Sequence, residues 1–453
     1  MKVSPGIDPR PPRPVEETPP QGPGAPRSTG SAVSGLALRG VVFSVVDQVI
    51  VSGTSFATSV VVGRICSQAE FGVYYLGLSF VLFFRDVQGE FISAPYVIYC
   101  HRRRGQALAA YTGSTLVHQV FLSALAMACL LGLAGVLSPG AGPTGLAPAA
   151  WVLVGAIPLL LLRERIRQLA FSHLRLATAI AIDSGVAILQ LSSLLLLAYA
   201  RVLTAGAVYG VMGAACALPC LAWFLANKPH LRFLPSQVKA DWCHNWSFAK
   251  WTLASYLVGS TTPYITPWLV ALAHGEAATG VWAACNTLVN GSNIFVVGLA
   301  NFLTPKAARA FAKGGLRDLR RVLWKTAALF ATTLGAFCLL MLVAGDLPAV
   351  WVYGGQYTGT GPVLVVLALN TLATSLGITA GNGLWAIERP QANFAADLCT
   401  FVVTVAMALA LVHPLGVLGA AIAALAGSTL GVAVRCLTLV RLTAAVRYAS
   451  RPA

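Results

Sequence analysis

The sequence predicts an all-α polytopic membrane protein with about twelve transmembrane helices in two lobes of six. Three observations predict this fold: the composition is apolar, charged residues divide the chain into spans, and the sequence repeats weakly at half its length. Hydrophobic residues make up 57% of the 453 residues and charged residues only 10%. Soluble domains contain roughly 25% charged residues, so the composition is that of a membrane protein.

Apolar segments of bilayer-spanning length follow one another along most of the chain. They lie at residues 36–63, 71–99, 107–137, 147–162, 177–200, 203–226, 247–271, 277–303, 322–345, 359–385, 392–412 and 416–443. The fourth segment is short for a span.

Lysine and arginine gather in alternate loops. The loops after even-numbered segments hold Arg102, Arg103, Arg104, Arg163, Arg165, Arg167, Arg175, Lys228, Arg232, Lys239, Lys250, Lys306, Arg309, Lys313, Arg317, Arg320, Arg321, Lys325 and Arg389. The loops after odd-numbered segments hold only Arg64 and Arg201. Because positive charge near a span resists translocation, the basic loops and both basic tails are predicted to be cytoplasmic. Arg85 is the one basic residue expected inside a span.

The net charge of +16 is explained by this topology. Basic loops on the cytoplasmic side attract the anionic inner leaflet, so membrane lipids are expected partners and nucleic acid is not. The cysteines form no CxxC pair and no Cys/His cluster at metal spacing, so neither a metal, a cofactor nor a disulfide framework is expected.

A weak internal repeat divides the chain into domains. Placing Ser52 over Ser260 pairs Ala69–Tyr74 with Ala277–Trp282, and Pro95 falls over Pro305 after a slip of two residues. We interpret the repeat as a duplication that gave two lobes of the same orientation. The predicted domains are a disordered Pro/Gly-rich tail at 1–35, an N-lobe at 36–226, a cytoplasmic linker at 227–246, a C-lobe at 247–443 and a cytoplasmic tail at 444–453. The first tail has no apolar core and so is no signal peptide; a docking segment is the alternative interpretation.

The second span carries three ionisable residues, which are costly at membrane depth and are therefore candidates for function. Arg85, Asp86 and Glu90 lie on one helix face about 140° wide, which should line a cavity. Arg85 and Glu90 are candidate substrate contacts. Alternatively, Arg85 pairs with Asp86 or Glu90 and neutralises a packing interface. Two acids against one base leave one carboxylate without a partner on this helix.

Carboxylates in other spans suggest ion coupling. Asp47 lies near the middle of the first span and Asp183 about two turns inside the fifth, and we group Asp86 with them as candidate sites for a proton or sodium ion, because burial raises the proton affinity of a carboxylate. Alternatively, Asp47 or Asp183 forms a salt bridge with Arg85.

Polar residues of the second lobe are expected to be neutral. Asn293 on the eighth span and Asn370 on the tenth are candidate substrate contacts. Asn370 belongs to a helical repeat with Thr374, Gly377 and Gly381, and small and amide residues at this spacing more often serve helix packing.

Five stretches carry a resemblance to a known family: the acid-Phe-Gly-x-Tyr stretch Glu70–Tyr74, then Thr304–Ala310, Tyr353–Tyr357, Gly383–Pro390 and Pro414–Ala421. In these the chain resembles the multidrug/oligosaccharidyl-lipid/polysaccharide (MOP) flippase superfamily, in its O-antigen or exopolysaccharide transporter branch. The resemblance covers residues 36–443.

The resemblance implies a V-shaped pair of six-helix lobes that alternate access to a central cavity in the inner membrane. The cargo would be an undecaprenyl-diphosphate-linked oligosaccharide, carried from the cytoplasmic to the outer leaflet. In that branch a cationic cavity holds the diphosphate and sugar, and Arg85 alone matches that role. Drug and cation antiporters of the superfamily use aspartates in the first and fifth spans, where Asp47 and Asp183 lie.

Three alternatives stay open. The first is a proton- or sodium-coupled exporter of small cationic or amphipathic compounds. A membrane glycan polymerase or glycosyltransferase would need a sizeable outer loop with convergent charges, and residues 346–358 offer Asp346 alone. A major-facilitator transporter normally carries an acid in the loop after its second span, whereas residues 101–105 contain none.

Overall fold

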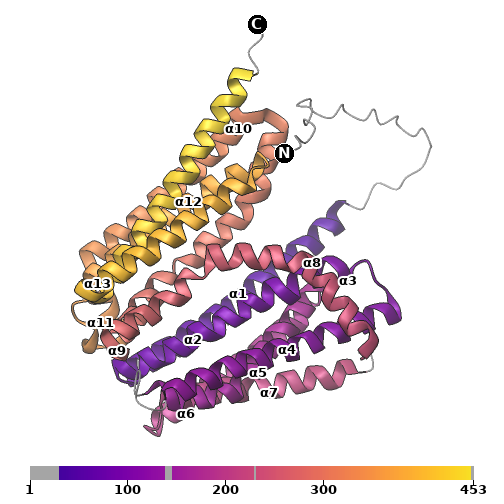
Figure 1. Cartoon of the computed structure of the whole chain (residues 1–453), viewed down its shortest axis with the longest axis vertical. Coiled ribbons are helices and arrows are strands. Elements are labelled where there is room, and N and C mark those ends of the chain that lie inside the picture. The colour runs from indigo at the N-terminus through magenta and orange to yellow at the C-terminus, as the bar shows by residue number, and fades with distance from the viewer. Residues whose placement is uncertain (1–29, 138–144, 229–230, 450–453) are drawn as a thin grey trace. The chain divides into compact units, whose positions relative to one another are not determined.

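The computed structural model describes residues 30–137, 145–228 and 231–449, and this part of the chain consists of helices and short connections without a β-strand (Figure 1). The predicted all-α class is confirmed. The chain divides into two compact units, residues 1–42 and 43–453. Within the first unit, residues 30–42 are helical, including the last residues of the predicted tail at 1–35. The rest of that tail, most of the connection at 138–146 and residues 450–453 of the C-terminal tail lie outside the described residues.

The first half of the chain follows the predicted spans closely. Its elements are α1 (Gly30–Ile65), α2 (Gln68–Gln88), the π-helical turn η1 (Gly89–Ser93), α3 (Ala94–Cys100), α4 (Gly105–Leu137), α5 (Leu146–Ser172), α6 (Leu176–Tyr199) and α7 (Ala205–Asn227). The second predicted span comprises α2, η1 and α3 in continuous helical backbone. Ser67 caps α2 by accepting a hydrogen bond from the Glu70 amide at 3.2 Å.

In the second half, glycines turn the chain between spans. Its elements are α8 (Pro235–Ser260), α9 (Thr262–Asn290), α10 (Asn293–Ala344), α11 (Leu347–Tyr353), the 3₁₀ turn η3 (Gly355–Tyr357), α12 (Gly361–Ala386) and α13 (Pro390–Ala449). Helices α9, α10 and α13 each bend sharply where a glycine has positive φ: Gly275 at 79°, Gly315 at 60° and Gly416 at 57°. Only glycine adopts this backbone readily, because it lacks a Cβ.

Divided at these glycines, the described helices form the twelve predicted spans. Span seven runs through α8 into α9, span eight from α9 into α10, and spans eleven and twelve are the two parts of α13. Eight of the described helices are individually long and apolar enough to cross a membrane. The chain is therefore a multi-pass membrane protein.

Two helices extend past the ends predicted from charge. Helix α5 continues to Ser172, so Arg163, Arg165 and Arg167 lie on it and not in a loop. Helix α13 continues to Ala449, past the predicted end at 443, and Arg435 lies on it inside the predicted span at 416–443, where it forms an ion pair with Asp397. The expectations that Arg85 is the one basic residue inside a span, and that the second lobe has only neutral polar residues, are therefore wrong. A charge need not end a span where a neighbouring helix supplies a partner for it.

Helix α8 contacts both halves of the chain. Residues 235–246 of the predicted linker are helical, and their side chains pack on the first half: Arg103 binds Asp241 at 2.9 Å and Tyr111 donates to Asn245 at 2.8 Å. Further along α8, Gly259 lies against Asp397 of α13. One helix thus joins the two halves.

Helices α2 and α9 cross closely at glycines that the internal repeat relates. A Cβ built on Gly72 would lie 1.9 Å from the Glu276 carbonyl oxygen, and one built on Gly280 would lie 1.9 Å from the Gln68 carbonyl oxygen. The pairing that sets Ser52 over Ser260 also sets Gly72 over Gly280 and Gln68 over Glu276. The contact is therefore reciprocal between equivalent positions, as in a pseudo-symmetric interface.

Two of the stretches that carry the family resemblance meet beside this crossing. The rings of Phe71 and Tyr353 lie 5.7 Å apart, and the Gln356 side chain donates to the Gly63 carbonyl at 3.0 Å. The turn between α1 and α2 is thereby held against the turn before α12.

We predict that Gly72→Ala destabilises the protein by about 1–3 kcal/mol, because the added methyl group overlaps a backbone carbonyl that cannot rotate away. The measurement is the melting temperature of the purified protein in detergent. Gly155→Ala is the matched control, since a Cβ there meets nothing within 4 Å. Equal melting temperatures for the two variants would contradict the close crossing.

Candidate functional site

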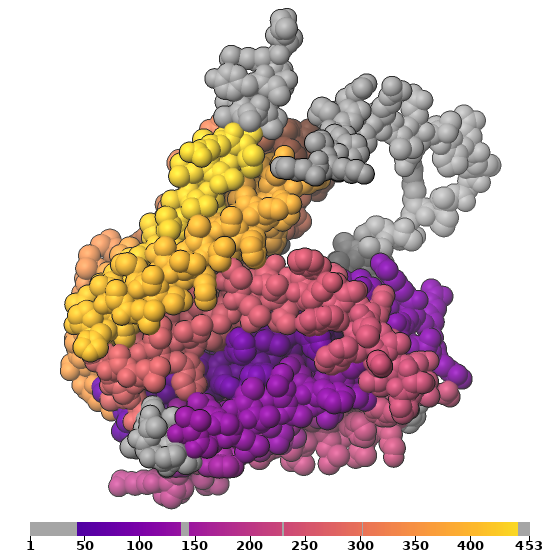
Figure 2. All heavy atoms as spheres, viewed as in Figure 1, coloured from indigo at the N-terminus to yellow at the C-terminus, as the bar shows by residue number. Residues whose placement is uncertain are grey.

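A cavity of about 560 Å³ lies among the helices of the first half. Side chains from α1, α2, η1, α5, α6 and α7 line it, together with Tyr256 of α8. Figure 2 shows the surface hollowed beneath the red band of α8 and α9, with indigo residues visible inside the hollow. The polar face predicted for the second span does line this cavity: Arg85, Asp86, Gly89, Glu90 and Ser93 all contribute to its wall.

Asp86 connects Arg85 to span seven. The Arg85 guanidinium donates two hydrogen bonds to Asp86 Oδ1, from Nε at 3.0 Å and Nη2 at 2.9 Å. The other carboxylate oxygen, Oδ2, accepts from the hydroxyls of Tyr256 at 3.0 Å and Tyr264 at 2.5 Å. These tyrosines lie on α8 and α9, on either side of the break between the two helices. The pairing left open by the sequence is thus between Arg85 and Asp86, and the tyrosines could not have been found from the sequence.

The Arg85–Asp86 pair is accessible from the cavity. The Arg85 side chain is 40% exposed and that of Asp86 27%. An exposed ion pair exchanges partners at little cost, because water and ligands compete with it. Arg85 is therefore the cavity cation that a ligand can reach with least rearrangement.

Glu90 is the second carboxylate on this face of the second span, and it takes no part in the Arg85–Asp86 pair. It lies in η1 and lines the cavity, and within the described residues it makes no ion pair. Its backbone carbonyl accepts from Thr252 of α8 at 3.4 Å. The π-helical turn that carries Glu90 is a rare backbone form found often at functional sites.

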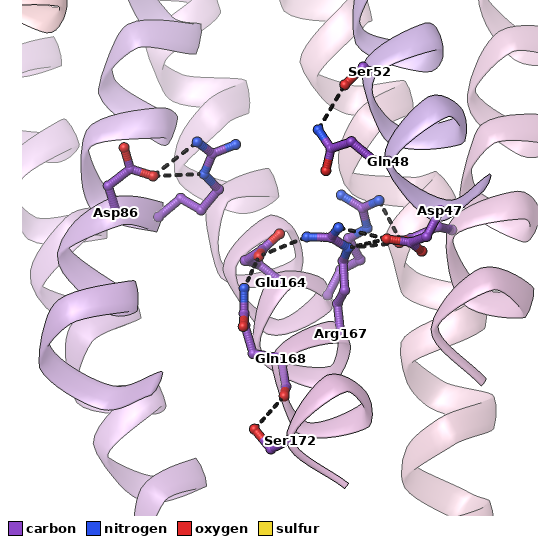
Figure 3. Close-up of polar contacts among 11 residues, drawn as sticks. Asp47, Gln48, Ser52, Asp86, Glu164, Arg167, Gln168 and Ser172 are labelled. Atoms are coloured by element: carbon purple, nitrogen blue, oxygen red, sulfur yellow. Dashed lines mark hydrogen bonds and ion pairs between the residues drawn. The ribbon is translucent and has the colours of Figure 1, made fainter. Parts of the chain in front are cut away.

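Asp47 and Asp183 bind arginines of α5, and not Arg85. Arg167 donates to Asp47 Oδ2 at 2.6 Å and to Asp183 Oδ2 at 3.0 Å, and Arg163 donates to Asp183 Oδ1 at 2.5 Å. Glu164 lies 3.4 Å from Arg167 in the same cluster. Figure 3 shows Arg167 between Asp47 and Glu164, with Asp86 on a helix across from them. We call these five residues of α1, α5 and α6 the α5 charge cluster.

The α5 charge cluster is deeply buried. The side chains of Asp47 and Asp183 are 1% and 0% exposed, and that of Arg167 is 14% exposed. A carboxylate removed from water to this degree needs a cation or a proton beside it. The sequence did contain a signal, because Arg163 and Arg167 are four residues apart and so share one face of a continued helix.

The cavity wall as a whole is mixed in charge. Arg85, Arg163 and Arg167 face Asp86, Glu90, Glu164 and Asp183, and neutral polar side chains such as Gln168 and Gln190 lie between them. Such a wall suits a polar ligand that offers many hydrogen-bonding groups better than a compact anion alone.

The candidates of the second half do not line this cavity. Asn293 donates to Asn290 at 2.9 Å, and the backbone carbonyl of Asn370 accepts from Thr374 at 2.8 Å. Arg435 packs against the glycines near Asn370, since its guanidinium lies 3.3 Å from where a Cβ of Gly377 would be. The structure thus separates Asn293 and Asn370 from Arg85, and their role as substrate contacts stays a prediction.

We predict that Arg167→Gln lowers the free energy of unfolding by about 3–5 kcal/mol, because it leaves the buried Asp47 carboxylate without its cation. Adding Asp47→Asn to the same chain should recover part of the loss by removing the unpaired charge. Melting temperatures of the single and double variants test this. A double variant no more stable than Arg167→Gln would show that the pair is not the cause.

Comparisons with known proteins agree with this architecture. The family profile described as "Polysaccharide biosynthesis protein" matches residues 37–311. No curated protein matches the sequence. Among solved structures, an inward-facing multidrug resistance MATE family transporter of the MOP superfamily superposes with a TM-score of 0.74 at 12% identity, covering 91% of this chain and 100% of its own. The lipid II flippase MurJ, in an inward closed conformation, gives 0.70 at 13% identity, covering 88% of this chain and 87% of its own.

The family profile spans more than half of the chain, including every residue that lines the cavity. The structural matches are too distant in sequence to show more than the fold, which is that of MOP superfamily transporters. The chain belongs to the polysaccharide biosynthesis protein family and has the MOP flippase fold.

Proposed function

We propose that this protein is a flippase for undecaprenyl-diphosphate-linked oligosaccharide, moving it from the cytoplasmic to the outer leaflet of the inner membrane by alternating access of its two halves. The observation that carries the proposal is the polar cavity inside the region matched by the polysaccharide family, with Arg85 exposed on its wall. The many amide and hydroxyl groups of the wall suit a sugar, and Arg85 suits a phosphate. Both termini are proposed to be cytoplasmic, from the alternation of basic loops.

In this mechanism the diphosphate competes with Asp86 for Arg85. In the conformation described, Arg85 donates two hydrogen bonds to Asp86 Oδ1, and a phosphate oxygen could accept the same two hydrogen bonds. Asp86 would then lose the cation that balances its charge while still accepting from Tyr256 and Tyr264. Substrate binding would thereby change the contact between α2 and the break in span seven.

Ion coupling through Asp47, Asp86 or Asp183 belongs to the same proposal. In the conformation described, arginines bind all three carboxylates. A proton or sodium ion could bind them only after those pairs open. For Asp47 and Asp183 this would require a rearrangement of α5 against α1 and α6, whereas Asp86 would be freed when Arg85, on the same helix, releases it. Initial flipping rates measured with and without imposed proton and sodium gradients would decide whether such coupling exists.

One observation favours a second candidate, an exporter of small cationic compounds. The carboxylates of the cavity outnumber its arginines, and Glu90 makes no ion pair within the described residues. Glu90 would attract a cation electrostatically, as Arg85 would attract an anion. A membrane polymerase or glycosyltransferase has no comparable support, since the described residues place the polar groups in a cavity and not on an outer loop.

We predict that Arg85→Ala slows flipping of a fluorescent undecaprenyl-diphosphate oligosaccharide about tenfold or more, because it removes charge-assisted hydrogen bonds to the phosphate. The assay is transfer between leaflets in proteoliposomes. Arg104→Ala is the control, since Arg104 is exposed and does not line the cavity. Unchanged flipping by Arg85→Ala would leave Arg85 with a packing role and remove the main support of the proposal.

We predict that Asp86→Asn tightens binding of the same substrate about tenfold, because the amide competes less well than a carboxylate for the Arg85 guanidinium. Its dissociation constant is measured by native mass spectrometry. This variant also separates the two candidate functions. If the protein exports cations, Asp86→Asn should bind the cargo more weakly, because a cavity carboxylate is lost. Tighter binding of a cationic dye than of the glycolipid would also favour the exporter.

A further inference from the structure

A second cavity, of about 520 Å³, lies at the basic end of the first half and shares no lining residue with the first. It is formed by the first turns of α4 and α6, the last turns of α5 and α7, and residues 231–232 before α8. The topology predicted from the basic loops puts this end at the cytoplasmic membrane surface. We call it the basal pocket.

The charges of the basal pocket are all positive. Arg175 and Arg232 line it together with His173, and no aspartate or glutamate is among its lining residues. Arg232 is held in place: its Nη1 donates to Gln106 at 3.1 Å and its backbone amide donates to the Ala109 carbonyl at 3.3 Å. This leaves the guanidinium with further donors for a ligand.

Two long helices begin at the basal pocket. The first turn of α4, at Gln106 and Leu108, and the first turn of α6, at Thr178, form part of its wall. The first amides of a helix have no intrahelical acceptor, and the helix dipole places partial positive charge there. Both helix ends therefore add to the attraction that the arginines exert on an anion.

A buried cation behind the wall independently favours an anion. Arg165 is 0% exposed, and its guanidinium lies 4.5 Å over the ring of Tyr96. The Tyr96 hydroxyl contacts His173 Nε2 and Thr112 Oγ1, each at 2.9 Å, and both of these residues line the basal pocket.

Arg165 also lacks a compensating charge nearby. Within the described residues it makes no ion pair, and its Nε and Nη1 have no hydrogen-bond partner. A full positive charge at low dielectric acts over a longer distance than one in water. Arg165 thus raises the positive potential at the inner wall of the pocket without itself being exposed.

The remaining wall is apolar. Leu108, Leu169 and Leu231 line the basal pocket, together with Trp223. Basic pockets between transmembrane helices at the cytoplasmic surface suit the headgroups of anionic lipids, which bring a phosphate and an apolar chain together.

We propose that the basal pocket binds a phosphate group, held by Arg175, Arg232 and the first turns of α4 and α6. The phosphate could belong to an anionic lipid of the cytoplasmic leaflet or to a free phosphate compound, since both present the same oxygens. The site is independent of the transport cavity and of the proposed function.

The test compares ligand binding by the full chain and by Arg175→Gln/Arg232→Gln. The probes are phosphatidylglycerol against phosphatidylcholine, measured by native mass spectrometry, and inorganic phosphate, measured by the shift in melting temperature. Arg317→Gln/Arg320→Gln is the matched control, because it removes the same charge from exposed residues of α10 outside the pocket.

We expect the pocket variant to bind phosphatidylglycerol, inorganic phosphate or both about tenfold more weakly, with the control unchanged. Weakening for phosphatidylglycerol alone identifies a lipid site, and weakening for phosphate alone a site for a soluble ligand. Equal affinities of pocket variant and wild type, or an equal loss in the control, would overturn the proposal. Arg175→Gln alone replaces the double variant if the latter does not fold.

Discussion

The requirement that a charge inside a membrane find its partner within the protein governs the first half of this chain. Arg163 and Arg167 are the partners of Asp47 and Asp183. These ion pairs join α5 to α1 and α6. These ion pairs help to fix the rotation of the three helices about their axes. The polar sides of these helices face one another, and the cavity lies where they meet. Glu164 and Gln168 lie on the same side of α5 as Arg163 and Arg167, and all four line the cavity.

A second constraint, the crossing of α2 and α9, joins the halves. At Gly72 and Gly280 each backbone approaches the other so closely that a methyl group does not fit. Close approach of small residues is a principal source of helix association in lipid, where apolar side chains gain little by leaving the bilayer. The crossing lies inside a stretch that the repeat relates, residues 69–74 over 277–282. A duplicated segment that packs against its own copy is constrained from both sides.

The spans, and the turns between them, were predictable because bilayer thickness and hydropathy act on local sequence. Arg163 and Arg167 were misplaced for the same reason: a local rule treats a charge as the end of a span, and cannot include the partner Asp183, which lies on another helix. The polar face formed by Arg85, Asp86 and Glu90 could be predicted because the spacing of these residues places them on one side of a helix. Tyr256 and Tyr264 were not, since their relation to Asp86 exists only after α8 and α9 have packed on α2.

The two groups of charges in the cavity differ in how readily they can respond to a ligand. Opening the α5 charge cluster exposes carboxylates that are almost wholly buried, so it costs several kcal/mol and keeps α5 in place. The Arg85–Asp86 pair is already open to the cavity, and its exchange with a ligand costs little. Yet this weaker pair is the one that also contacts span seven, through two tyrosines on either side of a helix break. In the proposed transport mechanism, alternating access needs a rigid half and a contact that ligand binding can change, and α5 and Asp86 would supply these separately. On that proposal, a cavity with nearly balanced charge would respond to a charged ligand at Arg85 alone.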